Sequence, residues 1–246
     1  MFETALAVLL ATLRLGPLLV FAPPFSLVRL PIWTRTVLAM ALALCVLGIS
    51  TPVQAQAWRG DFVSAASSEL VLGIAMALPL QLAFAMIGVT GRALDIQAGF
   101  GLAFLIDPTT RAQMPLIGAL FTYAAAAIFF ATGGVADVLA VLSASFAVLP
   151  LGAAAAPGAV QAVLAFLGTV AILSMGVAGL AILTLLLIDL VIAMLSRTLP
   201  QMNVLVLGFQ VKALTALLLL PLTLGLSAGI VARILRLAIE AMTRIA

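Results

Sequence analysis

Residues 160–188 read VQAVLAFLGTVAILSMGVAGLAILTLLLI and contain no charged side chain. A helix of about 20 apolar residues, rising 1.5 Å per residue, is enough to cross the roughly 30 Å hydrocarbon core of a bilayer. The run belongs to a longer uncharged segment between Asp137 and Asp189. It therefore predicts a membrane-type helix, and similar stretches lie on both sides of it.

The composition extends this prediction to the whole chain of 246 residues. Hydrophobic residues make up 65% and charged residues 8%, against roughly 45–50% and about 25% in soluble domains. These values exclude a soluble enzyme, a disordered protein and a fibrous protein. They leave an integral membrane protein or a subunit buried in an assembly. Further apolar stretches of spanning length lie near 4–22, 36–57, 70–90, 112–131 and 204–232. We predict an all-α integral membrane-type protein, with residues 1–246 forming one helical unit.

Proline and glycine predict where the helices begin and end. Pro23-Pro24 should end the first helix, because a proline ring removes a hydrogen-bond donor and clashes one turn back. Pro31 suits the first turn of the second helix. Further breaks are predicted at Gly133-Gly134, between Pro150 and Pro157, and at Pro200.

Several kinds of chemistry are not expected. The chain has no histidine, the commonest general base and a frequent metal ligand, and its one cysteine, Cys45, lies in an apolar run. The net charge of +3 comes from 11 basic and 8 acidic residues that are scattered along the chain, so nucleic-acid binding is not expected. We predict no catalytic residue, no metal and no cofactor.

Three ionisable residues lie in hydrophobic context: Arg14, Asp189 and Lys212. A charge inside a membrane costs at least about 2.5–3.5 kcal/mol on insertion scales, so such groups pair or line an aqueous path. Asp189 could pair with Arg197 or Lys212 as a structural contact. A proton or ion relay is the alternative interpretation.

Small residues recur at helical spacing, as in the GxxxG pair of Gly225 and Gly229. Such a face lets helix backbones approach closely in lipid. It could serve packing within the chain or packing against partner subunits.

Residues 91–115 contain four charges, three glycines and two prolines in an otherwise apolar chain. The apolar core of this insert, residues 96–106, is too short to span a bilayer. Asp107 and Pro108 suit the start of a short helix, which Pro115 would stop. The insert could be an interfacial loop, or a re-entrant element facing a pore or substrate path.

An ordered set of short motifs resembles the FliR/SctT family, the R-type export-gate subunit of flagellar and virulence type III secretion systems. The motifs run over nearly the whole chain: Arg14-Leu-Gly-Pro17, Ala22-Pro-Pro-Phe25, Pro31-x-x-x-Arg35, Glu69-Leu-Val-Leu-Gly73, Gly88-x-x-Gly91, Gln97-Ala-Gly99-Phe-Gly101, Asp107-Pro108, Met114-Pro115, Pro200-Gln-Met-Asn203 and Gly208-Phe-Gln-Val-Lys212. One departure is Gln210, which stands where the family often has proline.

The resemblance implies a non-enzymatic channel subunit at the bacterial inner membrane, at the basal body. A P-like portion, about residues 1–190, would be followed by a Q-like helical hairpin, about residues 191–246. Tilted and broken hairpins would close a ring with P-type and Q-type subunits and contact membrane lipid and other export-apparatus membrane proteins. Unfolded export substrates would pass through the pore.

The family closes its pore partly with a plug loop, which the resemblance places at residues 104–115. Phe104, Ile106 and Met114 would then supply apolar obstruction, while Asp107 and Pro108 would fix the bend. The remaining plug residues are Arg111 and Pro115, and Gly99 and Gly101 would allow close packing or a hinge.

Two other functions are kept as alternatives. Broken helices and buried charge also occur in secondary transporters of small solutes, although the sequence shows no inverted repeat. An intramembrane enzyme using Asp107 and Asp189 as a carboxyl pair is the third possibility.

Overall fold

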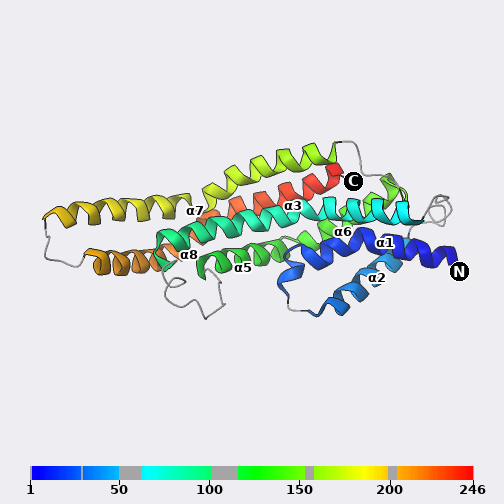
Figure 1. Ribbon diagram of the computed structural model, residues 1–246, viewed down its shortest axis with the longest axis horizontal. Helices are drawn as coiled ribbons and strands as arrows, with labels where there is room; N and C mark the ends of the chain where they lie inside the picture. Colours follow the sequence, from blue (N-terminus) through cyan, green and yellow to red (C-terminus); the bar gives the residue numbers. More distant parts are fainter. Residues whose placement is uncertain are drawn as a thin grey trace. The chain divides into compact units, whose positions relative to one another are not determined.

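Every regular element that the structure describes is a helix (Figure 1). The computed structural model describes residues 2–28, 30–49, 62–100, 116–152, 158–198 and 204–245. The elements are α1 (Phe2–Phe21), η1 (Phe25–Leu27), α2 (Ile32–Ile49), α3 (Phe62–Gln97), α5 (Leu116–Ala131), α6 (Gly134–Val148), α7 (Ala159–Thr198) and α8 (Val204–Ile245). The prediction of an all-α membrane-type protein is confirmed.

The helix boundaries follow the predicted punctuation. The first helix, α1, ends at Phe21, just before the proline pair, and α7 ends at Thr198, just before Pro200. Between α5 and α6 the chain turns at Gly133, whose φ of +79° lies in the left-handed region that favours glycine. These breaks are local, so sequence alone was sufficient to locate them.

The described residues contain four helices long and apolar enough to cross a membrane, where the sequence predicted six spans. The four are α1, α3, α7 and α8, and a fifth is counted if α5 and α6, bent by 70° at their break, form one span. The apolar part of α2 covers only Ile32–Gly48, and residues 50–61 lie outside the described residues.

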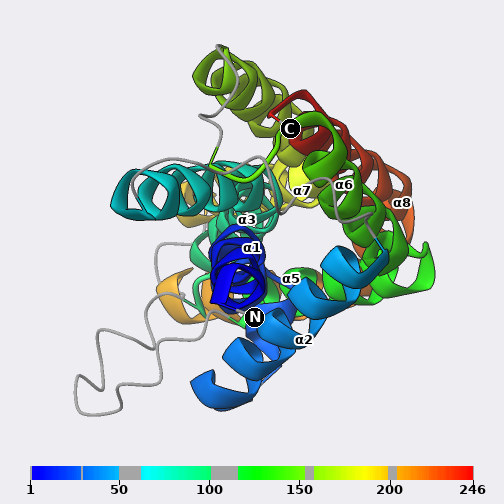
Figure 2. The ribbon, with the colours of Figure 1, turned by 90° about the vertical axis from the view of Figure 1, so that its right-hand side faces the viewer.

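The chain divides into two compact units. The first comprises Met1–Ala83, Phe129–Thr169 and Leu235–Ala246. Within it α1 and α2 lie side by side (Figures 1 and 2). The fully buried face of α2 consists of the small residues Ala39 and Ala43, which permit close approach. Large side chains fill the rest of the core: Leu10, Leu15, Leu18, Leu72, Met76, Leu80, Phe129, Leu142 and Phe146.

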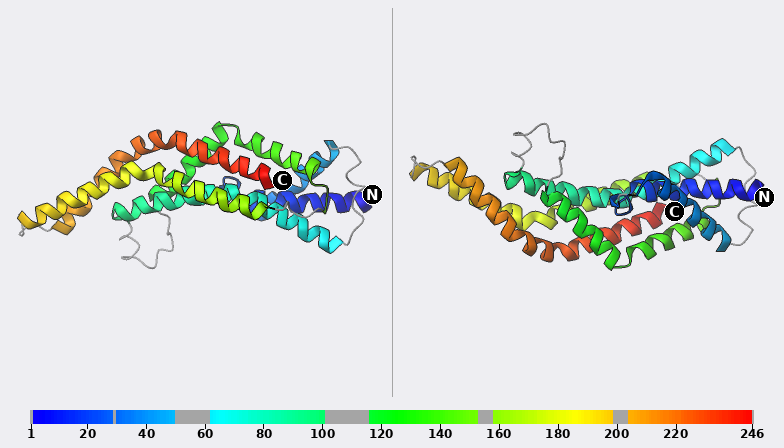
Figure 3. Two further views of the ribbon diagram at one scale, coloured as in Figure 1. Left: turned by 90° about the horizontal axis from the view of Figure 1, so that it is seen from above. Right: turned by 90° about the horizontal axis from the view of Figure 1, so that it is seen from below.

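The second unit comprises Phe84–Ile128 and Val170–Ile234. Here α7 and α8 form an antiparallel hairpin whose tip projects past the ends of α3 and α5 (Figures 1 and 3). Two glycines lie at the contact between these helices, where an added Cβ would be at ordinary van der Waals distance. A Cβ added to Gly208 would lie 3.5 Å from Ile192, and one added to Gly176 would lie 3.6 Å from Ile230.

Candidate functional site

All residues of the predicted plug lie outside the described residues, and so does the predicted hinge residue Gly101. The plug residues are Phe104, Ile106, Asp107, Pro108, Arg111, Met114 and Pro115. The structure does describe the helices on both sides, namely the end of α3 and the start of α5, which belong to the second unit. The candidate site is therefore the pair of stems from which the predicted plug would extend.

Asp95 of α3 caps the first turn of α5. The backbone N–H of Ile117 donates to its Oδ1 and the N–H of Gly118 to its Oδ2, both at 2.9 Å. The first N–H groups of a helix have no partner within the helix, and a carboxylate there also meets the positive end of the helix dipole. Asp95 is 1% exposed, so its carboxylate is buried at this junction, whereas Arg92 is exposed.

Sequence reasoning missed this role because the cap is supplied from another helix. The only local signal was an acidic residue in a largely apolar helix. A second contact supports the same junction: a Cβ added to Gly91 would lie 2.6 Å from the Cα of Gly118. Two glycines thus let the backbones of α3 and α5 touch where Asp95 joins them.

The other stem is held by three polar side chains from three helices. Gln97, the last residue of α3, donates from Nε2 to Asp189 Oδ2 of α7 at 2.9 Å. The other carboxylate oxygen of Asp189 forms an ion pair with Lys212 of α8. Of the two predicted partners of Asp189, the structure selects Lys212. The pair is partly exposed, at 35% for Asp189 and 22% for Lys212.

Gly99 lies just beyond Gln97 and has a φ of +87°. A Cβ there would lie 2.9 Å from the ring of Phe209 on α8. Both the backbone conformation and the close ring therefore require glycine. The predicted role of Gly99 in close packing agrees with this geometry, while its role as a hinge stays a prediction.

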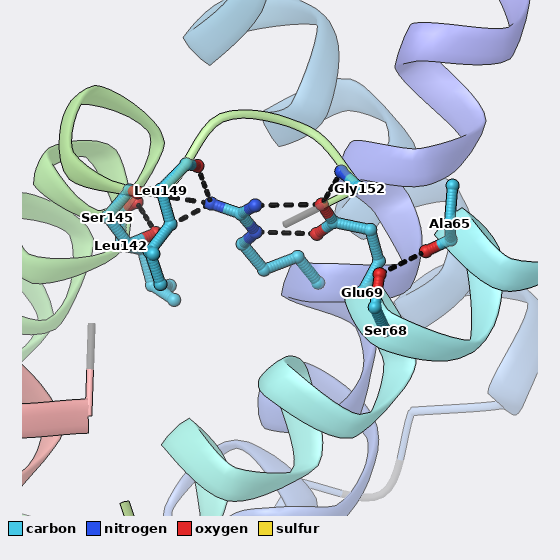
Figure 4. Close-up of polar contacts among 8 residues, drawn as sticks. Ala65, Ser68, Glu69, Leu142, Ser145, Leu149 and Gly152 are labelled. Atoms are coloured by element: carbon cyan, nitrogen blue, oxygen red, sulfur yellow. Dashed lines mark hydrogen bonds and ion pairs between the residues drawn. The ribbon is translucent and has the colours of Figure 1, made fainter. Parts of the chain in front are cut away.

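Arg14 occupies a separate site in the first unit (Figure 4). It pairs with Glu69 of α3 through Nε–Oε2 at 2.6 Å and Nη2–Oε1 at 2.8 Å. Its Nη1 donates to the carbonyls of Ser145 and Leu149 at 3.1 and 3.0 Å. The N–H of Gly152 donates to Glu69 Oε1 at 2.7 Å. The cluster thereby joins α1, α3 and the end of α6.

Close packing surrounds this cluster. The Arg14 guanidinium lies 4.3 Å from the ring centroid of Phe146, which suits a cation–π contact. A Cβ added to Gly73 would lie 2.5 Å from the carbonyl oxygen of Arg14. The sequence identified Arg14 as a charge in hydrophobic context, but gave no sign that Glu69 was its partner.

Arg35 is a further positioning residue. The sequence motif that contains it gave no indication of this role. Its guanidinium donates to the carbonyls of Val20, Ser26 and Val28 at 2.8, 3.2 and 2.7 Å. It thus fastens the start of α2 to the end of α1 and the connecting turn. The Val20 carbonyl belongs to the last turn of α1, where a positive charge is favourable.

The described residues include no group of three or more His, Cys, Asp or Glu that could hold a metal ion. The described helix junctions are instead fastened by polar side chains that each make two or more contacts, as at Asp95, Arg35 and Arg14. Gly225 and Gly229 are exposed, and no described atom lies within 4 Å of a Cβ placed on either. The fastened helix junctions can hold backbone segments in fixed positions.

Comparison with known proteins gives a consistent result. The family model described as bacterial export proteins, family 1, matches residues 5–238. The chain is 30% identical over 230 residues to the flagellar biosynthetic protein FliR of Aquifex aeolicus, an alignment covering 91% of this chain and 87% of that protein. It is 27% identical over 242 residues to FliR of Bacillus subtilis, covering 96% and 93%. The surface presentation of antigens protein SpaR of Shigella sonnei is 27% identical over 152 residues, covering 62% and 59%.

Proposed function

Because the chain belongs to the FliR/SctT family of bacterial export proteins, it is a membrane subunit of a flagellar or type III export apparatus, and we propose that it is a non-enzymatic wall segment of the export channel. In this proposal it encloses a pore at the bacterial inner membrane through which unfolded substrates pass. The insert after α3 blocks the pore at rest.

The observation that carries the proposal is the fastening of both stems of this insert. Asp95 and the contact between Gly91 and Gly118 hold the start of α5 against α3. Gln97 ties the end of α3 to Asp189 of α7. A loop that carries function is typically positioned by a rigid scaffold in this way. The stems therefore support a plug that extends from a fixed base.

Within the proposed plug, Phe104, Ile106 and Met114 obstruct the pore. Closing a pore with apolar side chains is effective because a dewetted constriction resists ions. Asp107 and Pro108 fix the bend of the loop. Export energy comes from other components, since the chain has no Gly-rich phosphate-binding loop ending in Lys-Ser or Lys-Thr.

The proposed partners are P-type and Q-type subunits and other membrane proteins of the apparatus at the basal body. Exposed apolar side chains on α2 support this assembly: Trp33 is 78% exposed, and Ile32 and Val37 are each 60% exposed. The division into a P-like portion, about 1–190, and a Q-like hairpin, about 191–246, remains part of the proposal.

Deletion of residues 107–113 from the assembled complex tests the plug. The expected result is an increased ion leak across the membrane, because the obstruction is removed while the stems remain. Co-purification of the partner subunits with the variant serves as the control for assembly. An unchanged leak in a correctly assembled complex would contradict the plug. Solute uptake by the purified chain alone in liposomes would instead favour a secondary transporter.

A further inference from the structure

Helices α3 and α5 of the second unit are joined firmly to each other. A Cβ added to Gly91 would lie 2.6 Å from the Cα of Gly118, so the two backbones touch there. A Cβ added to Gly88 would lie 3.4 Å from Thr122 Oγ1. Asp95 adds two hydrogen bonds at 2.9 Å and is 1% exposed, so water has little access to replace its donors. The α3–α5 pair therefore behaves as one body.

The junction of this α3–α5 pair with the α7–α8 hairpin is weaker. The carboxylate of Asp189 receives one hydrogen bond from Gln97, and the Asp189 side chain is 35% exposed. Water therefore competes with the Gln97 amide for this carboxylate. Phe209, whose ring lies beside Gly99, is 41% exposed. Both contacts are made by side chains that can turn away without a shift of backbone.

A small cavity also lies between the α3–α5 pair and the hairpin. Leu94 and Ile117 line one side of it, and apolar residues of α7 and α8, among them Ala181 and Ala216, line the other. Its volume is about 10 Å³, at the lower limit for one water molecule. Side chains that face a void lose dispersion contacts on that side. Packing against the hairpin is therefore looser than packing of α3 against α5, where an added Cβ would meet backbone.

We propose that the hydrogen bond from Gln97 to Asp189 is a releasable latch, which holds the α3–α5 pair on the hairpin at rest and breaks when the channel opens. This inference rests on the proposed function, because the two stems of the proposed plug are the ends of that pair. Asp189 is the part of the latch fixed to the hairpin, since its other oxygen pairs with Lys212. Gln97 is the part that releases, and it is a positioning residue that acts on the plug through the end of α3.

Release at Gln97 leaves no charge without a partner. Asp189 keeps Lys212 as its counter-ion, and because both side chains are partly exposed, water can satisfy the freed carboxylate oxygen. Release at Asp95 would instead leave a buried carboxylate and two buried N–H groups without partners. The junction that opens at the lower cost is therefore the one at Gln97.

Gln97→Leu in the assembled complex tests the latch. The substitution removes the donor and leaves the ion pair within the hairpin in place. Ion leak across the membrane should rise about two- to tenfold, which is the shift in population expected for the loss of one hydrogen bond. Gln81→Leu is the matched control, because Gln81 is exposed on the same helix, and it should leave the leak unchanged. Equal leak in the wild type and in Gln97→Leu would overturn the latch.

An exchange of the two side chains separates the hydrogen bond from a general effect on packing. In Gln97→Glu combined with Asp189→Asn, the asparagine amide donates to the glutamate carboxylate, so the hydrogen bond and the net charge are kept. The leak of this variant should return close to the wild-type level. A leak as high as that of Gln97→Leu, with partner subunits co-purifying normally, would show that the hydrogen bond does not hold the junction.

Deletion of residues 107–113 distinguishes failure of the latch from failure of the plug. If the latch acts through the plug, Gln97→Leu should add no leak to that of the deletion, and an additive leak would overturn the latch. A deletion without any leak would contradict the plug. A leaking deletion together with a tight Gln97→Leu complex would contradict the latch alone.

Tethers test the latch without reference to the leak. In a Cys45→Ala background, Gln97→Cys and Asp189→Cys joined by a short, cleavable bifunctional thiol reagent should stop substrate export, and a reducing agent should restore it. A disulfide between Gly88→Cys and Thr122→Cys, which the close contact of these positions suits, should leave export unchanged because α3 and α5 move together. Continued export with the first tether would overturn the latch, and so would loss of export with the second alone.

Discussion

Arg14 and Glu69 form a bidentate ion pair with both side chains 0% exposed (Figure 4). The residues are 55 positions apart and come from α1 and α3. Burying two charges is costly, and it is sustained here because carbonyls and an N–H occupy the remaining hydrogen-bonding positions. The pair thus joins α1 to α3 within the core of the first unit, where burial of charge is most costly.

Removal of one partner of this pair should be strongly destabilising. Glu69→Gln leaves a buried guanidinium without its carboxylate, and the expected loss is about 3–5 kcal/mol in the free energy of unfolding. This loss is measured by unfolding the purified chain in mixed detergent while its helical signal is recorded. Glu240→Gln, at an exposed glutamate, should change it by less than about 0.5 kcal/mol.

The double variant Arg14→Met with Glu69→Leu should lose less stability than the sum of the two single variants. It leaves polar backbone groups without partners, but no unpaired charge. Strict additivity of the single losses would show that the two residues do not act as a pair.

Asp95→Ala should weaken the junction of α3 with α5. Loss of the carboxylate leaves two buried N–H groups without an acceptor, at a cost of about 1–3 kcal/mol. Hydrogen exchange of the amides of Ile117 and Gly118 should accelerate accordingly. Asp137→Ala, in the exposed first turn of α6, is the matched control and should leave exchange at both amides unchanged.

Gly91→Ala should destabilise the same junction through a steric clash. Its Cβ would lie 2.6 Å from the Cα of Gly118, and backbone has little freedom to move away. The expected cost is about 1–3 kcal/mol in the free energy of unfolding, measured as above. Gly88→Ala, whose Cβ would lie 3.4 Å from Thr122 Oγ1, should be better tolerated.

Gly225→Ala tests the role of the GxxxG pair. A Cβ at Gly225 meets no described atom within 4 Å, so alanine should stabilise the isolated chain by about 0.5–1 kcal/mol through its higher helix propensity. A stabilised chain that co-purifies fewer partner subunits would assign this face to packing between subunits. Loss of stability in the isolated chain would instead assign it to packing within the chain.

Lys212→Met should cost about 1 kcal/mol, less than the loss of Glu69, because the pair with Asp189 is partly exposed. Asp189→Asn combined with Lys212→Met should recover much of this loss, since the amide can still contact Gln97. The unfolding measurement on the full chain applies here too. A double variant as unstable as Lys212→Met alone would contradict the pairing.

Helix boundaries were predictable because they depend on local chemistry. Pro23-Pro24 and Gly133 act through the backbone of their own turn, and the structure places helix ends beside both. The hydrogen-bond partners were not predictable, because they join distant segments. Asp95 is one example, because the two N–H groups that donate to its carboxylate lie on α5, 22 and 23 residues away. For the plug, Phe104 through Pro115 lie outside the described residues, so its role rests on the family and on the stems.

The amino-acid sequence alone determined that this protein is helical and membrane-type, and it identified Arg14 as a charge in apolar surroundings, but it did not identify the buried carboxylates of Glu69 and Asp95. Apolar content and proline or glycine punctuation act over one or two turns of chain, so no tertiary information was needed. Only the tertiary structure decided that Arg14 binds Glu69, that Asp95 caps α5 and that Asp189 pairs with Lys212 rather than with Arg197. A hydrogen bond requires two atoms within about 3 Å of each other, and packing between helices is what sets that distance.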